Sequence, residues 1–202
     1  MDDRRKRPSP FRKNTPYLKE QHKSLHGLQI WVALPKELES CEPSFYHAEA
    51  SALPRFQIEG ADFHLIAGKA MGYESPIPVY SPLYFMKVIA TQTTQLNLGE
   101  DLYGESRIYN LEGEIEIDGH AFGPKQLLVA KDSKLCSFVI KAHTKIYIFG
   151  GEAFPEPRHI FWNFVASDPA LIEAAKIRWQ NQAFDPIPGE HEFVPLPPFR
   201  AK

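Results

Sequence analysis

The chain has 202 residues, a formal net charge of −2 and a sequence pI near 6.4. It contains no run of about 20 apolar residues, which a transmembrane helix requires, and its charged N-terminus lacks the apolar stretch of a secretory signal. A near-neutral charge gives no support to nucleic-acid binding by the whole protein. We therefore expect a cytoplasmic globular protein, and 18 prolines favour short strands and turns over a helical fold.

Residues 1–26 differ in composition from the rest of the chain. They hold eight Lys or Arg against three Asp or Glu, three prolines and no apolar periodicity. We interpret this segment as a basic, disordered tail. The run Arg4–Arg7 leaves open a nuclear-localisation or nucleic-acid patch as an alternative.

From Leu28 onward the pattern is one of short apolar runs separated by Pro, Gly and charged residues, which predicts strands. Ile115 and Ile117 alternate with glutamates, and Asp118-Gly119 then provides a strong tight-hairpin signal. Such spacing is typical of a sandwich or barrel. The predicted strands are 28–34, 62–67 (ending at Gly68), 83–89, 94–98, 107–111, 114–117, 126–129, 135–140 and 145–149.

One helix is expected near the C-terminus. Ser167 and Asp168 supply N-cap oxygens, Pro169 suits the first helical turn, and Phe184 with Asp185-Pro186 ends the helix. Leu171, Ile172, Ala175 and Trp179 form one apolar stripe along it.

The chemistry-bearing residues form no familiar motif. Cys41 and Cys136 make neither a disulfide framework nor a zinc knuckle. The eight histidines contain no His-x-His pair and no metalloprotease helix pattern, and neither a phosphate-binding glycine loop nor a Gly-x-Ser-x-Gly elbow is present.

Several stretches, taken in order, resemble the pirin family of the cupin superfamily. Gly-Leu-Gln-Ile-Trp-Val-Ala-Leu-Pro at 27–35 is similar to the strand after that family's first cupin, and Leu-Glu-Gly-Glu-Ile-Glu-Ile-Asp-Gly at 111–119 to the hairpin of its second. Residues 150–157 are similar to the exit from the second barrel, and 161–197 to the family's C-terminal end. The resemblance implies an all-β fold, a cupin-type antiparallel barrel or sandwich (double-stranded β-helix), with a C-terminal amphipathic helix.

The resemblance also implies a domain organisation. We expect a basic tail over 1–26, strands and a Pro-rich linker equivalent to the inter-cupin region over 27–90, a C-terminal cupin barrel over 91–160, and a helix with an extended Pro-rich tail over 161–202. Family members are usually bicupins, and the chain is similar to their second half.

The family's non-haem iron is held by three histidines and a glutamate of the first cupin, and these have no counterpart here. The corresponding cupin positions, near residues 99–102 and 106, contain no histidine. Iron(II) in such a barrel needs several converging imidazoles. We therefore expect the fold without metal ligands or a resident cofactor in this chain.

Two functions remain open. The first is a binding or interaction module without its own iron, in a family linked to transcriptional cofactor roles. The second is a quercetin 2,3-dioxygenase-like oxygenase, completed by a separately encoded first cupin. The absent iron ligands favour the first function, and we expect no catalytic residue in this chain alone.

Two sets of residues are candidates for binding. The first could line a small pocket for an aromatic ligand: His64, Tyr109, Phe138 and Tyr147. The second could form an apolar interface for self-association or for a complementing cupin half: Trp31, Trp162, Leu171, Ile172, Ala175 and Trp179.

Overall fold

The computed structural model describes residues 27–99, 101–130, 137–186 and 191–198. The predicted basic tail lies outside the described residues. The chain divides into two compact units, one formed by residues 46–154 and one that joins the segments before and after it.

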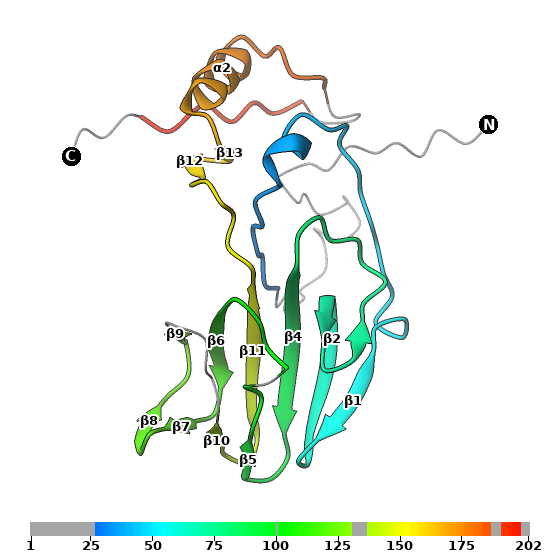
Figure 1. Cartoon of the computed structure of the whole chain (residues 1–202). Coiled ribbons are helices and arrows are strands. Elements are labelled where there is room, and N and C mark those ends of the chain that lie inside the picture. The colour runs from blue at the N-terminus through cyan, green and yellow to red at the C-terminus, as the bar shows by residue number, and fades with distance from the viewer. Residues whose placement is uncertain (1–26, 100, 131–136, 187–190, 199–202) are drawn as a thin grey trace. The chain divides into compact units, whose positions relative to one another are not determined.

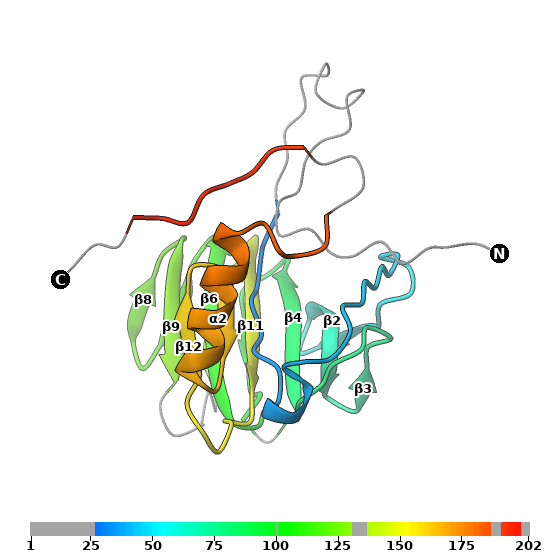
Figure 2. The same cartoon turned by 90° about the horizontal axis from the view of Figure 1, so that it is seen from above.

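The central unit is a β-sandwich built on a seven-stranded antiparallel sheet (Figure 1). Six of its strands follow the order β1-β2-β4-β11-β6-β9, and β3 pairs with β2. Their bounds are β1 Arg55–Ile58, β2 Ala61–Ala70, β3 Tyr73–Glu74, β4 Leu83–Ala90, β6 Glu105–Glu112, β9 Gln126–Ala130 and β11 Thr144–Gly151. Figure 2 shows the same order from above, with β9 and β2 toward opposite ends.

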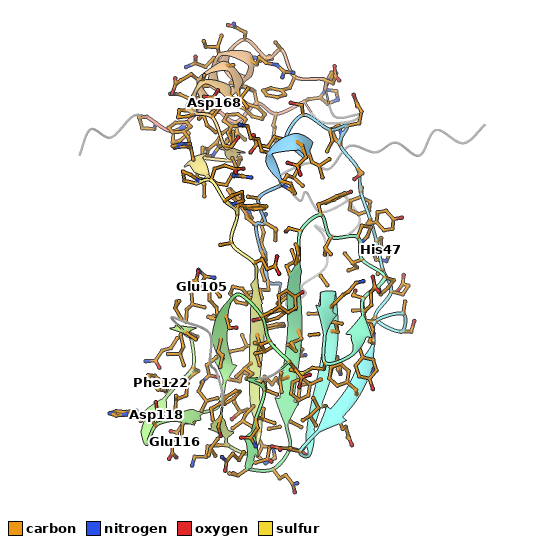
Figure 3. The ribbon with its side chains drawn as sticks, viewed as in Figure 1. His47, Glu105, Glu116, Asp118, Phe122 and Asp168 are labelled. Atoms are coloured by element: carbon orange, nitrogen blue, oxygen red, sulfur yellow. The ribbon has the colours of Figure 1, made fainter. Side chains whose placement is uncertain are left out.

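A four-stranded sheet, in the order β5-β10-β7-β8, forms the second layer of this unit. Its strands are β5 Thr94–Leu96, β7 Ile115–Ile117, β8 His120–Phe122 and β10 Phe138–Ile140. The predicted Asp118-Gly119 turn is confirmed: it joins β7 to β8 with Ile117 opposite His120, and both turn residues have positive φ. Asp118 and Phe122 are labelled on this hairpin in Figure 3.

The core of the unit follows from strict alternation along the strands. In β4 every second residue is buried, and β11 shows the same pattern from Thr144 to Ile148. A period of two sends alternate side chains to opposite faces of a sheet. The inner faces of the two sheets together bury one apolar cluster that includes Phe63, Leu65, Met86, Ile108, Ile115, Phe138, Ile146 and Ile148.

The all-β fold with one C-terminal helix is confirmed, and several boundaries need correction. The strand predicted over 62–67 does not stop at Gly68 but continues to Ala70. Gly68 has φ +76°, and a Cβ there would lie 1.8 Å from the Leu83 carbonyl oxygen. Glycine therefore allows the strand to bend past its neighbour, at a register irregularity between Leu65 and Ala67.

The division expected at residue 90 does not coincide with a boundary between the compact units. Strands β1 to β4, which precede that residue, belong to the same sheet as β6 and β11. The barrel expected over 91–160 is therefore formed within 46–154. The sequence did not show that strands far apart along the chain, such as β4 and β11, would pair.

The second unit contains a β-hairpin and a helix. Strands β12 (His159–Phe161) and β13 (Phe164–Ala166) pair, and α2 (Pro169–Gln180) packs against them. The predicted helix start is confirmed, because Asp168 is the N-cap and its carboxylate accepts a hydrogen bond from the Ala170 N–H at 2.8 Å. The helix ends four residues before Phe184, earlier than predicted.

The strand predicted over 28–34 is wrong, since these residues form no strand and are followed by a short 3₁₀ helix, η1 (Lys36–Leu38). No strand of the described part of the chain pairs with this apolar run. The Leu34 carbonyl accepts hydrogen bonds from the Arg158 guanidinium instead, at 3.1 and 3.3 Å.

A buried ion pair joins the two segments of this unit. Arg158 and Glu39 meet at 3.2 Å, with side chains only 8% and 9% exposed. Glu39 also accepts hydrogen bonds from the Ser167 N–H and hydroxyl, at 2.8 and 3.0 Å. One carboxylate thus links the N-terminal segment to the start of α2.

We predict that Glu39→Gln destabilises this unit by roughly 3 kcal/mol, because it leaves the buried Arg158 guanidinium without its full counter-charge. All three tryptophans of the chain belong to this unit, so tryptophan fluorescence during urea unfolding measures it directly. The control is Glu173→Gln, which breaks an exposed pair with Lys176 and should change stability by about 0.5 kcal/mol or less. Equal effects of the two substitutions on stability would contradict a stabilising role of the buried Glu39–Arg158 ion pair.

Candidate functional site

The outward face of the seven-stranded sheet carries one continuous row of side chains, one from each of its six main strands, that is a candidate for binding. Strand register places Arg55 opposite His64, His64 opposite Lys87, Lys87 opposite Tyr147, Tyr147 opposite Tyr109 and Tyr109 opposite Leu127. Directly paired residues in adjacent strands have Cβ atoms about 5 Å apart. We call these six residues the outer row.

The middle of the outer row is aromatic. The rings of Tyr147 and Phe85 stack with centroids 5.6 Å apart, and Phe149 meets Phe85 edge-on at 6.2 Å. Burial raises the pKa of the Tyr147 hydroxyl, and the nearby Glu112 carboxylate adds to this rise. The phenol is therefore neutral at physiological pH and offers both a flat apolar ring and a hydrogen-bonding hydroxyl.

The other end of the row is basic. Burial lowers the pKa of His64, and the neighbouring cations Arg55 and Lys87 lower it further, against an opposing effect of Asp62. His64 is thus held toward its neutral form, while Arg55 and Lys87 stay charged.

The acidic groups on this face are already engaged. Asp62 accepts a hydrogen bond from the Gln57 amide at 2.7 Å, and Glu112 accepts one from Lys145 at 2.7 Å. Among the described residues, neither Arg55 nor Lys87 forms an ion pair. Two cations beside an aromatic surface form a suitable environment for a flat anion.

Three of the four predicted pocket residues come together and the fourth does not. His64, Tyr109 and Tyr147 share the outer row, whereas Phe138 lies on β10 in the core and is 2% exposed. A lone three-residue strand gives no sign of which face is inward. Sequence reasoning missed Arg55, Phe85 and Lys87. The alternation of β4 could have placed Lys87 and Phe85 on the face opposite Met86.

The predicted interface residues divide between packing and exposure. Trp162 and Trp179 meet edge-on at 5.1 Å, and the Trp179 indole donates a hydrogen bond to the Val194 carbonyl at 2.8 Å. Ile172 is buried and Ala175 half-buried, while Leu171 and Trp31 are exposed. The apolar stripe therefore largely serves the internal packing of its own unit, where Phe164, Phe184 and Phe193 complete the aromatic cluster.

A hollow of about 730 Å³ lies beside the β2–β3 turn, lined in part by Ser75, Ile77 and Val79. Its charged groups, Lys69 and Glu74, pair with each other at 3.0 Å. Ser75 donates a hydrogen bond to the Ile66 carbonyl at 2.7 Å. These polar groups are committed within the protein, so the hollow offers less to a ligand than the outer row does.

Comparison with known proteins identifies the family. The model of the pirin C-terminal cupin domain matches residues 85–185. The chain belongs to the pirin family. A pirin-like protein of Caulobacter vibrioides is 36% identical over 182 residues, covering 89% of this chain and 62% of that protein. A putative quercetin 2,3-dioxygenase of Pseudomonas aeruginosa is 30% identical over 157 residues, covering 77% of this chain and 49% of the relative.

Solved structures agree with this assignment. The crystal structure of a quercetin 2,3-dioxygenase from Acinetobacter baumannii superposes with a TM-score of 0.75 at 26% identity, covering 85% of this chain and 58% of that one. This pirin-family chain thus spans about half to three fifths of the length of these relatives. No helix in the described part of the chain has the length and apolar character that crossing a membrane requires.

The donor set of the described barrel does not fit the non-haem iron that the resemblance implies for the family. The buried polar side chains of the central unit are neutral: Tyr84, Ser75, Ser106, Asn110 and Thr144. Asn110 Oδ1 is the one buried side-chain polar atom without a partner among the described residues. Those residues contain no group of three or more His, Cys, Asp or Glu that could hold a metal. A single amide oxygen does not replace several imidazoles.

We predict that acidification weakens the central unit through His64. Because its pKa is lowered in the folded state, the unfolded chain binds the proton more readily, and stability is lost as pH falls below the ordinary value of 6.5. Urea unfolding at about pH 7.5 and about pH 5.5 measures this loss, which His64→Gln should reduce. His120→Gln, in the exposed β7–β8 hairpin, is the control. A pH dependence unchanged by His64→Gln would refute the prediction.

Proposed function

We propose that this pirin-family chain is a binding module and that the outer row binds a flat aromatic anion. One observation carries the proposal: strand register brings Arg55, His64 and Lys87 together beside the Tyr147–Phe85 stack. The two cations supply charge, neutral His64 supplies a hydrogen bond, and the rings supply a flat apolar surface. A carboxylate or phenolate on an aromatic ring matches all three.

The chemistry of this site is recognition. The cations attract the anion and fix its charged end over β1, β2 and β4, and the aromatic rings orient the ring plane over β4 and β11. Iron, in family members that hold it, supplies Lewis-acid and oxygen chemistry. The described residues of this chain contain no group of three or more His, Cys, Asp or Glu that could hold such an ion by itself.

We predict that 1-naphthoate binds to the chain and that Lys87→Met weakens this binding about tenfold, since one charge-assisted contact is worth roughly 1.4 kcal/mol. Titration calorimetry measures the affinity. Lys145→Met is the matched control, because Lys145 lies on the same face but is paired with Glu112.

Two further ligands separate the contributions of charge and ring. The neutral 1-naphthalenemethanol and the non-aromatic cyclohexanecarboxylate should both bind more weakly than 1-naphthoate. Equal binding of all three ligands, or equal effects of the two lysine substitutions, would rule out the outer row as an aromatic-anion site.

A second candidate function is that of an oxygenase completed by a separate cupin. It is favoured by the similarity to the A. baumannii quercetin 2,3-dioxygenase structure and by the putative dioxygenase of P. aeruginosa. In that case iron would be held by the complementing chain. An intact cupin reading frame next to the gene would support this candidate.

We predict that the chain alone, incubated anaerobically with iron(II) and desalted, retains well below one iron per chain. The physical reason is the lack of converging imidazoles among the described residues. Elemental mass spectrometry measures the retained metal. The background control is a protein of another fold with an apolar core, treated with iron(II) and desalted in the same way. Near-stoichiometric iron would contradict the prediction and bring the oxygenase candidate forward.

A further inference from the structure

The two edges of the seven-stranded sheet differ in how they are protected. At one edge, β1 turns Arg55 and Gln57 outward, and both are exposed. At the other, β9 turns Leu127 and Val129 outward, 52% and 50% exposed. Charged and polar side chains are the usual protection of an edge against pairing with another chain. The β1 edge has this protection, and the outward face of β9 lacks it.

The structure shows which residues of β9 form backbone hydrogen bonds with β6. Its inner neighbour is β6, with Asn110 opposite Gln126 and Ile108 opposite Leu128. The Lys125 N–H donates to the Asn110 carbonyl at 2.6 Å, and Lys125 has φ +66°. This is the bulge geometry in which two successive N–H groups share one carbonyl. Gln126 and Leu128 therefore exchange bonds with β6.

Counting the register from the other end of the sheet assigns the hydrogen bonds to the same residues of β9. The two-residue Glu59-Gly60 turn joins Ile58 to Ala61, and the pair that closes such a hairpin exchanges both of its bonds. Following the register from there through β4 and β11 again assigns the β6-facing bonds of β9 to its even-numbered residues.

The odd-numbered residues of β9 consequently direct their backbone N–H and C=O groups away from β6, within the plane of the sheet. The backbone N–H and C=O groups of Leu127 and Val129 point past the edge of the sheet. Among the described residues, no strand pairs with that side of β9. Unpaired edge groups are a template for pairing with a further strand.

We propose that β9 pairs antiparallel with β9 of a second copy of this chain. In a two-fold arrangement centred on Leu128, Leu127 of one copy faces Val129 of the other, and the four outward N–H groups meet four outward C=O groups. The same register joins four exposed apolar side chains on one face. An isologous contact of this kind requires a surface complementary to itself, and the position of Leu127 and Val129 on either side of Leu128 meets that condition.

Leu127 belongs to the outer row, but this inference does not rest on the proposed ligand function, because it depends on the backbone and exposed side chains of the β9 edge and not on the basic end of that row. The paired strands would make one continuous sheet across the two-fold axis. The outer rows of the two copies would then lie on one continuous face, with Tyr109 next to Leu127 in each.

Analytical ultracentrifugation of the full chain tests the association. Because the edge is short, we expect a weak dimer, with the average mass rising above the 23.0 kDa of one chain over roughly 10 to 500 µM. Combined Leu127→Lys and Val129→Lys should keep the mass at one chain. The control Gln57→Lys, on the opposite edge, should associate like the unmodified chain.

Two outcomes would overturn the proposal. One is a single-chain mass for the unmodified protein throughout this range. The other is an association that survives the double lysine variant, or that Gln57→Lys abolishes equally, because a surface other than the β9 edge would then form the contact.

A disulfide test fixes the register. With Cys41 and Cys136 replaced by serine, Leu128→Cys should form a cross-linked dimer on oxidation, because the two copies of residue 128 face each other at about 4.5 Å between Cα atoms. Ala130→Cys is the matched control: it points to the same half-buried face, but its two copies would lie more than about 13 Å apart. Equal cross-linking of both variants would reject the centred register.

Discussion

The pairing of β4 with β11 is the constraint on which the central unit depends. This ladder runs without interruption from Leu83–Gly151 to Ala90–Thr144 and brings together strands about sixty residues apart. It sets which side chains of both strands point inward. Met86, Val88, Ile146 and Ile148 are completely buried as a result, while Lys87 and Tyr147 reach the opposite face. A slip of one residue would exchange the core for the outer row.

Much of this unit could be predicted locally because each long strand has a clear alternating pattern. The hairpin at Asp118-Gly119, the N-cap at Asp168 and the strand at 83–89 depend on neighbours within a few residues. The missing parts have long-range causes. Arg55 belongs to a short edge strand that only pairing with β2 reveals. Residues 28–34 are rich in apolar side chains, but none of the strands that the structure describes pairs with them. Phe138 was placed in a pocket because one short strand does not show its inward face.

The interior and the exterior of the sandwich have different chemical capacities. The inner faces meet through apolar side chains, and the described polar groups there are neutral and largely hydrogen-bonded, as with Tyr84 and Ser106. Such an interior stabilises the fold by excluding water and offers few donors to a cation. In the binding role that we propose, recognition takes place on the outward face, where β1, β2 and β4 contribute basic residues and β4, β6 and β11 contribute aromatic rings.

The same two-residue alternation that separates the core from the outer row also decides which backbone groups of β9 face away from β6. Side-chain direction and hydrogen-bond direction both alternate with a period of two. In β9, the residues with outward side chains are also those whose backbone groups face away from β6. Leu127 and Val129 therefore combine exposed apolar surface with backbone donors and acceptors that no strand of the described residues pairs with. Charged residues in their place would protect the edge, as Arg55 does on β1, so the composition of β9 favours a strand as the partner over solvent.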